Sequence, residues 1–375
     1  MAINISEKQI RSGWKVVSFG DIAKQCTEKV DRENNPFERY IEGGHMDSEN
    51  LHITRWGIFG DDYVGPAFHR IFRKGQILYG SRRTYLKKVA VAEFDGITAN
   101  TTFVIESQKP EILLPGLLPF IMLSDSFTSH SVLNSKGSTN PYINWKDIAK
   151  YELVLPPIER QQELLEILDK IEQNYLTVES LIKSITTLLN SLKIKISKGL
   201  SFNKNETEVV EIKLSDLCHI NYGKSPTKII EENGKFNVWG TGGITGKTNE
   251  ILCDKPAILL GRKGTINCPQ LINEPFWAID TTFYCTMKNS TNVDWLFWYL
   301  SSIDLSIYNE ASGVPSLSRT TLNNIKVPLP SPNEQQEQLR IINEIKGILL
   351  LKQSSKINLL SMRQKLLTHF FSRDT

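Results

Sequence analysis

One local sequence pattern occurs twice in this chain, nearly half the chain apart. The segment LPPIERQQELLEIL begins at Leu155, and LPSPNEQQEQLRII begins at Leu329. In each copy an apolar stretch ends in prolines, and a Gln-Gln pair then opens a segment with leucine and isoleucine at helical spacing. Because proline inside a helix removes a backbone hydrogen bond and clashes with the preceding turn, each helix must begin close to its prolines.

Further matching segments extend the repeat toward the N-terminus in the same order. They are ILYGSRRT (77–84) with ILLGRKGT (258–265), NTTFVI (100–105) with DTTFYC (280–285), PYIN (141–144) with PSLS (315–318), KYELVLP (150–156) with NIKVPLP (324–330) and, more weakly, WKVVSFGDIA (14–23) with VVEIKLSDLC (209–218). Proline-led helix starts recur by chance in unrelated proteins, but several landmarks in one order argue against chance. The sequence therefore predicts two copies of one unit of about 180 residues.

Each copy combines strand-like segments with short helices. The expected strands are QILYG, KKVAVAEF, TTFVIES and YELVLP in the first copy, and FNVWG, AILLG, TTFYCTM and NIKVPLP in the second. LLPFIMLSDSF (117–127) and VDWLFWYLSSI (293–303) are expected to be short buried helices at matching places. The predicted fold class is α+β: two tandem mixed α/β domains, each followed by a long helix. The expected boundaries are 1–155 for the first domain, 156–200 for its helix, 201–329 for the second domain and 330–375 for the second helix.

The first long helix carries a heptad seam, in which apolar residues alternate spacings of four and three: Leu164, Leu168, Ile171, Tyr175, Val178, Ile182, Ile185, Leu189, Leu192 and Ile196. A stripe this narrow requires a helical partner rather than a globular core. The second helix repeats the pattern, with an interruption at Lys352 and Lys356, at Ile342, Ile345, Leu349, Leu359 and Leu366. We predict that the two helices pair as an antiparallel coiled coil. Pairing between two copies of the chain is the alternative, and the interruption leaves the register of the distal helix open.

Composition excludes several classes of protein. No run of about eighteen apolar residues occurs, so no segment is expected to span a membrane. The N-terminal MAINISEKQIRSGW has no apolar core, which argues against a secretory signal. The five cysteines lack a C-x-x-C pair and are expected to be buried thiols in a reducing compartment, with metal binding as the minor alternative. A cytoplasmic location is therefore expected. The net charge of +3 does not by itself indicate nucleic acid.

Positive charge is nevertheless concentrated around one glycine turn in each copy. No acidic residue occurs between His69 and Ala92, and tyrosines are interleaved with the cations there. Such side chains can bind phosphates, and arginine can also bind guanine through two hydrogen bonds. A solvated charged surface is the alternative interpretation. The candidate DNA-binding residues are Arg70, Arg73, Lys74, Ser81, Arg82, Arg83, Tyr85, Lys87 and Lys88 in the first copy, and Arg262, Lys263 and Thr265 in the second.

Catalytic signatures are incomplete throughout the chain. TGGITGKT (241–248) has Thr241 where a P-loop requires glycine, and Pro256 curtails the helix that should follow. STNPYIN (138–144) resembles the Asn-Pro-Pro-Tyr loop of amino-methyltransferases but lacks the second proline, and no glycine-rich cofactor strand accompanies it. The six histidines show neither metal-ligand nor catalytic-triad spacing. We therefore predict no catalytic residue, no metal and no cofactor.

Taken together, these features resemble the specificity subunit of Type I restriction–modification enzymes. The resemblance covers essentially the whole chain and rests on LPPIERQQE and LPSPNEQQEQ, on the coils that follow them, and on KGSTNPYIN and SGVPSLS just upstream. It implies two target-recognition domains joined by antiparallel helices. Each domain would read one half of a bipartite double-stranded DNA site. It also implies that methylation and cleavage belong to other subunits that dock on this one. The expected partners are methyltransferase subunits, two in number, with restriction or translocase subunits as further candidates.

A tandem repeat closed by antiparallel helices suits DNA, because a pseudo-two-fold protein can face two half-sites on one side of the duplex. Phosphate contacts would position such a protein, and contacts to base edges would specify the sequence. Two other hypotheses remain open. One is a catalytic methyltransferase or nuclease subunit with fused recognition domains, and the other is a helical scaffold without a nucleic-acid role. The sequence does not reveal the target bases or the gap between half-sites.

Overall fold

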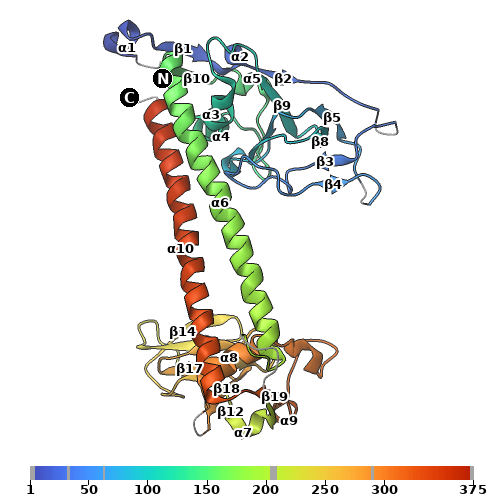
Figure 1. Ribbon diagram of the computed structural model, residues 1–375, viewed down its shortest axis with the longest axis vertical. Helices are drawn as coiled ribbons and strands as arrows, with labels where there is room; N and C mark the ends of the chain where they lie inside the picture. Colours follow the sequence, from blue (N-terminus) through green and yellow to red (C-terminus); the bar gives the residue numbers. More distant parts are fainter. Residues whose placement is uncertain (1–4, 32–33, 62–63, 203–208, 289–290, 372–375) are drawn as a thin grey trace. The chain divides into compact units, whose positions relative to one another are not determined.

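The computed structural model describes residues 5–31, 34–61, 64–202, 209–288 and 291–371 (Figure 1). The chain divides into two compact units: unit 1 is Met1–Val178 with Ser355–Thr375, and unit 2 is Glu179–Ser354. Each unit therefore contains one domain together with part of each long helix. Among the described residues, no helix has the length and apolar character needed to cross a membrane.

The described part of unit 1 contains two four-stranded sheets, in the orders β2-β9-β6-β7 and β4-β3-β8-β5, and a strand pair β1-β10. Its elements before the long helix are α1 (Glu7–Arg11), β1 (Lys15–Ser18), α2 (Phe19–Ile22), β2 (Ala23–Cys26), β3 (Arg39–Ile41), β4 (Gly57–Ile58), β5 (Phe68–Phe72), β6 (Ile77–Gly80), η1 (Thr84–Leu86), β7 (Val89–Val91), β8 (Gly96–Ala99), β9 (Thr102–Ser107), η2 (Pro115–Leu117), α3 (Leu118–Leu123), α4 (Asp125–Leu133), α5 (Trp145–Ile148) and β10 (Glu152–Leu155).

In the described part of unit 2, the sheets have the orders β12-β18-β15-β16 and β14-β13-β17, with a strand pair β11-β19. Its elements outside the long helices are β11 (Val210–Lys213), α7 (Leu214–Leu217), β12 (Cys218–Tyr222), β13 (Phe236–Gly240), β14 (Gly243–Thr248), β15 (Ala257–Gly261), β16 (Gln270–Ile272), β17 (Phe276–Ala278), β18 (Thr282–Met287), α8 (Val293–Leu300), η3 (Leu305–Tyr308), α9 (Arg319–Asn323) and β19 (Lys326–Leu329).

The two units repeat one topology. In order across the sheet, β2, β9, β6 and β7 take the same places as β12, β18, β15 and β16. The parallel pair β3–β8 corresponds to the parallel pair β13–β17, and each of these sheets adds an antiparallel hairpin partner, β4 or β14. Strand β5 has no counterpart among the described strands of unit 2. The repeat predicted from short motifs is therefore a repeat of strand order.

In each unit an inner strand of the four-stranded sheet, β6 or β15, is buried along its whole length. Because successive side chains of a strand point to opposite sides, such a strand must be covered on both faces of its sheet. In unit 1, Ile77 and Tyr79 of β6 join the core that contains the helices, whereas Leu78 between them joins a second core with Phe72 of β5. Unit 2 repeats this division: Ile258 and Leu260 of β15 face one core, and Leu259 faces the other. Apolar runs such as ILYG and AILLG are the sequence consequence of this double burial.

The segment 117–127, expected to be one short helix, forms two. Helix α3 ends at Leu123 and α4 begins at Asp125, with Ser124 extended between them (φ −65°, ψ 150°). The Ser124 side chain accepts a hydrogen bond from Phe127 N at 3.3 Å, which satisfies a free N–H of the new helix. Apolar residues on both sides of the break, such as Leu123 and Phe127, are buried, so composition alone did not indicate it.

The repeated Gln-Gln motif is a helix-start device. Helices α6 (Ile158–Ser197) and α10 (Pro332–Phe371) each follow a proline-bounded strand. The Gln161 side-chain nitrogen donates to Pro156 O at 2.8 Å, and Gln335 donates in the same way to Pro330 O at 2.9 Å. Both glutamines are buried, whereas the second glutamine of each pair is exposed. The first glutamine therefore satisfies the proline carbonyl that the turn into the helix leaves without a backbone partner.

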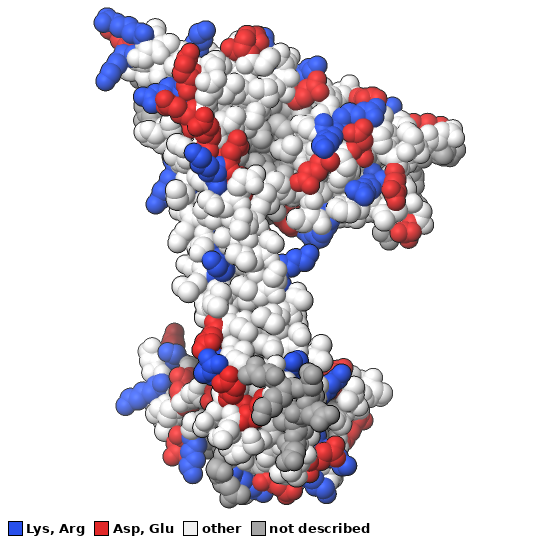
Figure 2. Space-filling model, viewed as in Figure 1, with Lys and Arg blue, Asp and Glu red and all other residues white. Residues whose placement is uncertain are grey.

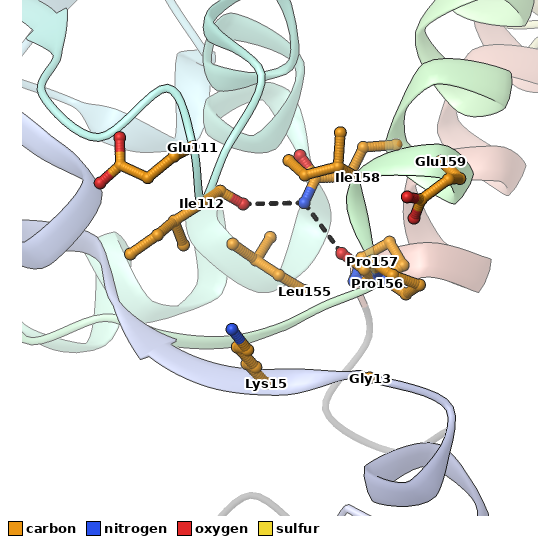
Figure 3. A pocket seen from close by; sticks show the side chains of 10 residues that line it. Gly13, Lys15, Glu111, Ile112, Leu155, Pro156, Pro157, Ile158 and Glu159 are labelled. Carbon is orange, nitrogen blue, oxygen red and sulfur yellow. Dashed lines mark hydrogen bonds between the residues drawn. The ribbon is translucent and has the colours of Figure 1, made fainter.

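Gln161 also connects its helix to the domain. Its nitrogen donates to Ile112 O at 2.9 Å, and its oxygen accepts from Leu114 N at 3.0 Å. Figure 3 shows Ile112 and Pro156 beside this helix start, with Lys15, Glu111 and Glu159 around a cavity of about 290 Å³. The helix start and the loop before η2 are thus joined through one buried side chain.

In unit 1, α6 and α10 run antiparallel. Leu164 and Leu168 share a core with Leu367 and Phe371, while Glu172, further along α6, pairs with Arg363, earlier on α10. In unit 2, the end of α6 and the start of α10 share a core that contains Ile196 and Ile342. The predicted seam positions on α6 are buried (Leu164, Leu168, Ile171, Tyr175, Leu192 and Ile196) or half-buried (Val178, Ile182, Ile185 and Leu189). On α10, Ile342 is buried, and Ile345, Leu349, Leu359 and Leu366 are half-buried.

The predicted interruption at Lys352 and Lys356 is a change of residue type, not of register. Helix α10 is continuous through both lysines, and the 3–4 spacing continues from Leu349 through them to Leu359 and Arg363. Lys356 Nζ lies 5.5 Å from the centroid of the Tyr175 ring, a cation–π distance. Long cationic side chains can therefore occupy seam positions while their apolar stems remain packed.

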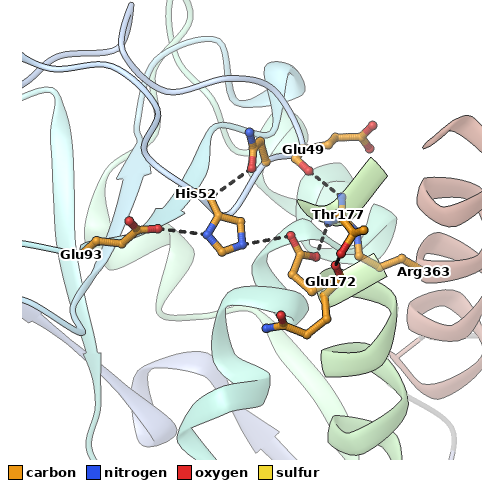
Figure 4. Close-up of polar contacts among 8 residues, drawn as sticks. Glu49, His52, Glu93, Glu172, Thr177 and Arg363 are labelled. Atoms are coloured by element: carbon orange, nitrogen blue, oxygen red, sulfur yellow. Dashed lines mark hydrogen bonds and ion pairs between the residues drawn. The ribbon is translucent and has the colours of Figure 1, made fainter. Parts of the chain in front are cut away.

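An ion-pair network, buried at Arg363 and Glu172, connects α10 to the domain of unit 1 (Figure 4). Arg363 Nη1 lies 3.1 Å from Glu172 Oε2, and Arg363 Nη2 donates to Glu49 O at 2.6 Å. His52 Nδ1 lies 3.0 Å from Glu93 Oε1, and His52 Nε2 lies 3.4 Å from Glu172 Oε1, an ion-pair distance without hydrogen-bond alignment. Two carboxylates thus face one imidazole, and one of them, Glu172, also pairs with the buried Arg363 guanidinium.

This network shifts the pKa of two of its members. Contact with the Glu172 carboxylate raises the pKa of His52, although burial opposes the shift. Burial alone would raise the pKa of Glu172, but His52 and Arg363 outweigh it, so the pKa of Glu172 lies below its ordinary value. Both shifts favour the charged forms.

Candidate nucleic-acid interface

The first basic turn, Gly80–Thr84, follows strand β6 and lies between two other segments of unit 1. Three backbone hydrogen bonds fix it: Ser81 N donates to Thr101 O at 3.0 Å, Arg83 N to Pro141 O at 2.7 Å, and Ile143 N to Ser81 O at 2.9 Å. The side chains of Arg82 and Arg83 are exposed. The turn therefore presents two arginines from a rigid backbone frame.

The second basic turn, Gly261–Thr265, has the same frame in unit 2. Its hydrogen bonds are Arg262 N to Thr281 O, Gly264 N to Pro315 O and Leu317 N to Arg262 O, each 2.9 Å long. Arg82 forms an isolated bridge with Tyr142, and Lys263 forms the equivalent bridge with Ser316. These contacts make Arg82 equivalent to Lys263 and Arg83 equivalent to Gly264. The two units thus present basic side chains from the same backbone frame, but the residues in the frame differ.

Arg83 has a backbone conformation that favours glycine. Its φ is 49°, in the left-handed region, and the equivalent Gly264 has φ 91°. For a residue with a Cβ this region costs about 1–2 kcal/mol relative to the right-handed one. The Arg83 side chain also donates from Nε to Asn140 Oδ1 at 3.2 Å. An arginine kept at such a position is expected where the side chain is needed for binding.

Several candidate residues of unit 1 have partners within the protein. Arg73 pairs with Glu28 at 2.9 Å and Asp95 at 3.3 Å, and Lys87 pairs with Glu49 at 3.0 Å and Asp125 at 2.6 Å. The acid-free stretch of sequence is therefore not an acid-free surface, because carboxylates from distant segments fold against it.

Three further candidates also have hydrogen-bond partners within the protein. Ser81 is buried and donates its hydroxyl to Thr101 O at 2.7 Å. Arg70 is half-buried and donates to Cys26 O at 3.1 Å, and burial lowers its pKa. Lys88 donates to Gly43 O. The exposed candidates that remain in unit 1 are Lys74, Arg82, Arg83 and Tyr85.

In unit 2, Lys263 and Thr265 are exposed, and Arg262 is half-buried. Sequence reasoning missed the segment against which each turn packs, although that segment was one of the repeat landmarks. In unit 1 it contributes Asn140 and the exposed Tyr142, which lie beside Arg83 and Arg82. The match between PYIN and PSLS was the signal that would have located it.

Charge on the surface is mixed rather than of one sign. On the face shown in Figure 2, outside the grey atoms, lysine and arginine side chains alternate with acidic ones over the domains. Long-range attraction by a uniformly basic surface is therefore not available on this face. Any affinity for a polyanion must arise from local groups such as the basic turns.

The segment 241–248 forms part of the hairpin β13–β14, so no phosphate-binding loop leads into a helix there. No cluster of three or more histidine, cysteine, aspartate or glutamate side chains suited to a metal ion occurs in the part of the chain that the structure describes.

The fold is thus a tandem pair of mixed α/β domains, each with a basic turn and each joined to a long helix. A family model for the Type I restriction modification DNA specificity domain matches residues 11–187 and again residues 206–360. The chain therefore belongs to this family and carries the domain twice.

Known relatives are specificity subunits. The chain is 25% identical over 183 residues to the EcoDI specificity subunit of Escherichia coli, and 27% identical over 172 residues to the HindI specificity subunit of Haemophilus influenzae. These matches span 49% and 44% of this chain but only 40% and 37% of those relatives. The MjaVIII specificity subunit of Methanocaldococcus jannaschii is 24% identical over 410 residues, which span 96% of this chain and 92% of the relative.

Solved structures share the fold. A chain from a structure on complex assembly and conformational transition of the type I R-M system has a TM-score of 0.61 at 18% identity, covering 96% of this chain and 98% of that one. The S subunit of a Type-I restriction-modification system from M. genitalium has a TM-score of 0.60 at 16% identity, covering 96% and 97%. The expected α+β fold of two tandem domains, each with a long helix, is confirmed.

Proposed function

We propose that this chain is the DNA-recognition subunit of a Type I restriction–modification complex. It binds a bipartite double-stranded site and directs methyltransferase subunits, and with them restriction or translocase subunits, to that site. Chemistry belongs to those partners, and the chain works in the cytoplasm. Family membership and the specificity subunits among its relatives support this function, and they disfavour the alternative of a catalytic subunit.

One observation carries the proposal at the level of residues: the same three-hydrogen-bond frame presents different basic side chains in the two units. Two recognition sites of one protein need a shared backbone frame with different side chains. Each site must contact the DNA backbone in the same way but read different bases. Residues 1–155 and 201–329 are then the two recognition domains. The helical segments 156–200 and 330–375 form the spacer between them and carry its apolar seam.

The proposal is tested with the chain assembled with a Type I methyltransferase subunit from the same genome. Selection from a random duplex library should enrich two short defined sequences separated by a gap of fixed length and undefined bases. The purified chain alone, incubated with DNA and labelled S-adenosylmethionine, should transfer no methyl group. Enrichment of a single continuous motif, of no motif, or methyl transfer by the chain alone would overturn the proposal.

A further inference from the structure

Two arginines of unit 2 converge on one exposed aromatic ring. Tyr222, the last residue of β12, is 46% exposed, and its ring packs on Phe283 with 5.0 Å between centroids. The guanidinium carbon of Arg262, in the second basic turn, lies 5.5 Å from the Tyr222 ring centroid, and that of Arg319, the first residue of α9, lies 5.1 Å from it. Three separate segments of the chain therefore build this cluster, named here the Tyr222 cluster (Tyr222, Arg262 and Arg319).

The two guanidiniums have no carboxylate partner among the described residues. Arg262 Nη1 donates to the backbone oxygen of Asp280 at 3.0 Å, and neither arginine forms an ion pair there. Glu310 lies nearby in the chain, but its carboxylate accepts from the Thr321 hydroxyl. The ring face offsets part of the repulsion between two cations, as in other cation–π contacts. The remaining charge favours an anion from outside the protein.

The fold of the repeat does not require an arginine at position 319. Leu317 and Ile143 make the same hydrogen bond to their basic turns, so Arg319 corresponds to Trp145 in unit 1. The Trp145 ring packs against Phe19 and Phe103, with centroid distances of 6.0 and 6.3 Å. Unit 1 therefore fills this place with an indole that contributes to its core. In unit 2 the same place holds an exposed cation.

We propose that the Tyr222 cluster binds one phosphate of the DNA backbone beside the half-site that unit 2 reads. Guanidinium groups bind phosphate oxygens through paired hydrogen bonds, and Tyr222 fixes where the two groups stand. Phosphate is favoured over a base edge because the half-buried Arg262 is tied to the backbone at Asp280, which positions it but limits its reach. The inference rests on the proposed function and adds an anchoring site in one unit.

The test measures duplex binding by the assembled methyltransferase complex across a salt series. Arg319→Gln should weaken binding to the selected site and to unrelated duplex by the same factor, about fivefold near 0.15 M salt, and should reduce the salt slope by about 0.9. Arg262→Gln should act in the same direction. Tyr222→Phe keeps the ring and should bind as the unaltered chain does, whereas Tyr222→Leu should weaken binding.

Lys326→Gln is the matched control, because it removes one exposed cation of unit 2 that is already paired with Glu211 at 3.0 Å. It should leave the salt slope unchanged. An unchanged slope in Arg319→Gln, or a loss confined to one base position, would overturn the phosphate site while the proposed function stands. If the unaltered complex binds no duplex specifically, the proposed function fails and this inference with it.

Discussion

At the scale of single residues, Arg83 and Gly264 occupy equivalent places in the two basic turns but differ in backbone preference. Glycine adopts φ 91° without steric cost, whereas arginine at φ 49° brings its Cβ close to the neighbouring carbonyl. The side chain of Arg83 is exposed apart from its hydrogen bond to Asn140. Its benefit is therefore expected in binding rather than in folding.

Arg83→Gly should separate the effect of this residue on stability from its effect on DNA recognition. Relief of the left-handed strain offsets the added freedom of the unfolded chain, so the free energy of unfolding should stay unchanged or rise by up to about 1 kcal/mol. Recognition should weaken at one half-site. Denaturant unfolding and selection from a duplex library measure the two effects. Arg82→Gly is the matched control, since Arg82 is not in the left-handed region and should gain no stability. A larger loss of stability in Arg83→Gly than in Arg82→Gly would show that the side chain holds the turn.

Sequence patterns located both basic turns but not the partners of their charges. Lys87 belongs to an acid-free stretch, yet Glu49 and Asp125, far away along the chain, lie within 3.0 Å of its ammonium group. Arg319 lies outside every basic run of the sequence, and Tyr222, whose ring it faces, precedes it by 97 residues (222 to 319). Charge clusters assembled from distant segments have no local sequence signal, which is why these positions required the structure.

At the scale of elements, the helix starts show which repeated residues are structural. The buried Gln161 satisfies two carbonyls and one N–H, while its neighbour Gln162 is exposed. The sequence predicted both long helices and their starts, because proline and heptad spacing are local signals. It did not predict the continuous register of α10, since the buried seam residue Arg363 is a cation whose partner, Glu172, lies on the other helix.

Gln161→Ala should destabilise unit 1. The substitution leaves Pro156 O, Ile112 O and Leu114 N without this partner, and each buried polar group left unpaired costs about 1–3 kcal/mol, so a loss of at least about 2 kcal/mol is expected. Denaturant unfolding of the full chain measures it. Gln162→Ala should change stability little. Equal effects of the two substitutions would contradict the assignment of Gln161 as the helix-start residue.

The network around His52 should make the stability of unit 1 depend on pH. The pKa of His52 is raised in the folded chain, so its contribution is complete below the ordinary value of about 6.5 and is lost as pH rises through the folded value. The pKa of Glu172 is lowered, so its contribution is present above the ordinary value of about 4.3 and is lost as pH falls through the folded value.

Raising the pH from just below 6.5 into the mildly alkaline range should therefore lower the free energy of unfolding, and His52→Gln should flatten that decrease. Thermal unfolding in a series of buffers measures it. Glu93→Gln removes the exposed partner but keeps Glu172, so it should reduce the dependence without abolishing it. An identical pH profile in His52→Gln and the unaltered chain would show that another group titrates.

At the scale of the whole molecule, the repeat predicted from the sequence is present as a shared strand order, and the family model finds its domain twice. The differences between the two copies could not be predicted from the sequence. Strand β5 of unit 1 has no counterpart among the described strands of unit 2, and Trp145 and Arg319 give equivalent positions opposite characters. Short motifs mark what the two copies share, so they give no information where the copies diverge. Under the proposed function, those divergent positions are where the two domains must differ.

The two units should divide recognition of the two half-sites between them. Arg82→Ala or Arg83→Ala should impair recognition of one half-site only, and Lys263→Ala should impair the other half, because each residue lies in the turn of its own unit. Arg262→Ala should instead weaken binding to all sequences, as expected of a phosphate contact. A lost contact to a base edge should cost about 1–3 kcal/mol at one position, whereas a lost phosphate contact should weaken binding to all sequences and lower the salt slope by about one. Binding by the assembled complex to duplexes altered in one half at a time, across a salt series, distinguishes the two cases. If all four substitutions leave affinity, sequence preference and salt slope unchanged, the basic turns are solvated surface and the DNA contacts lie elsewhere in each unit.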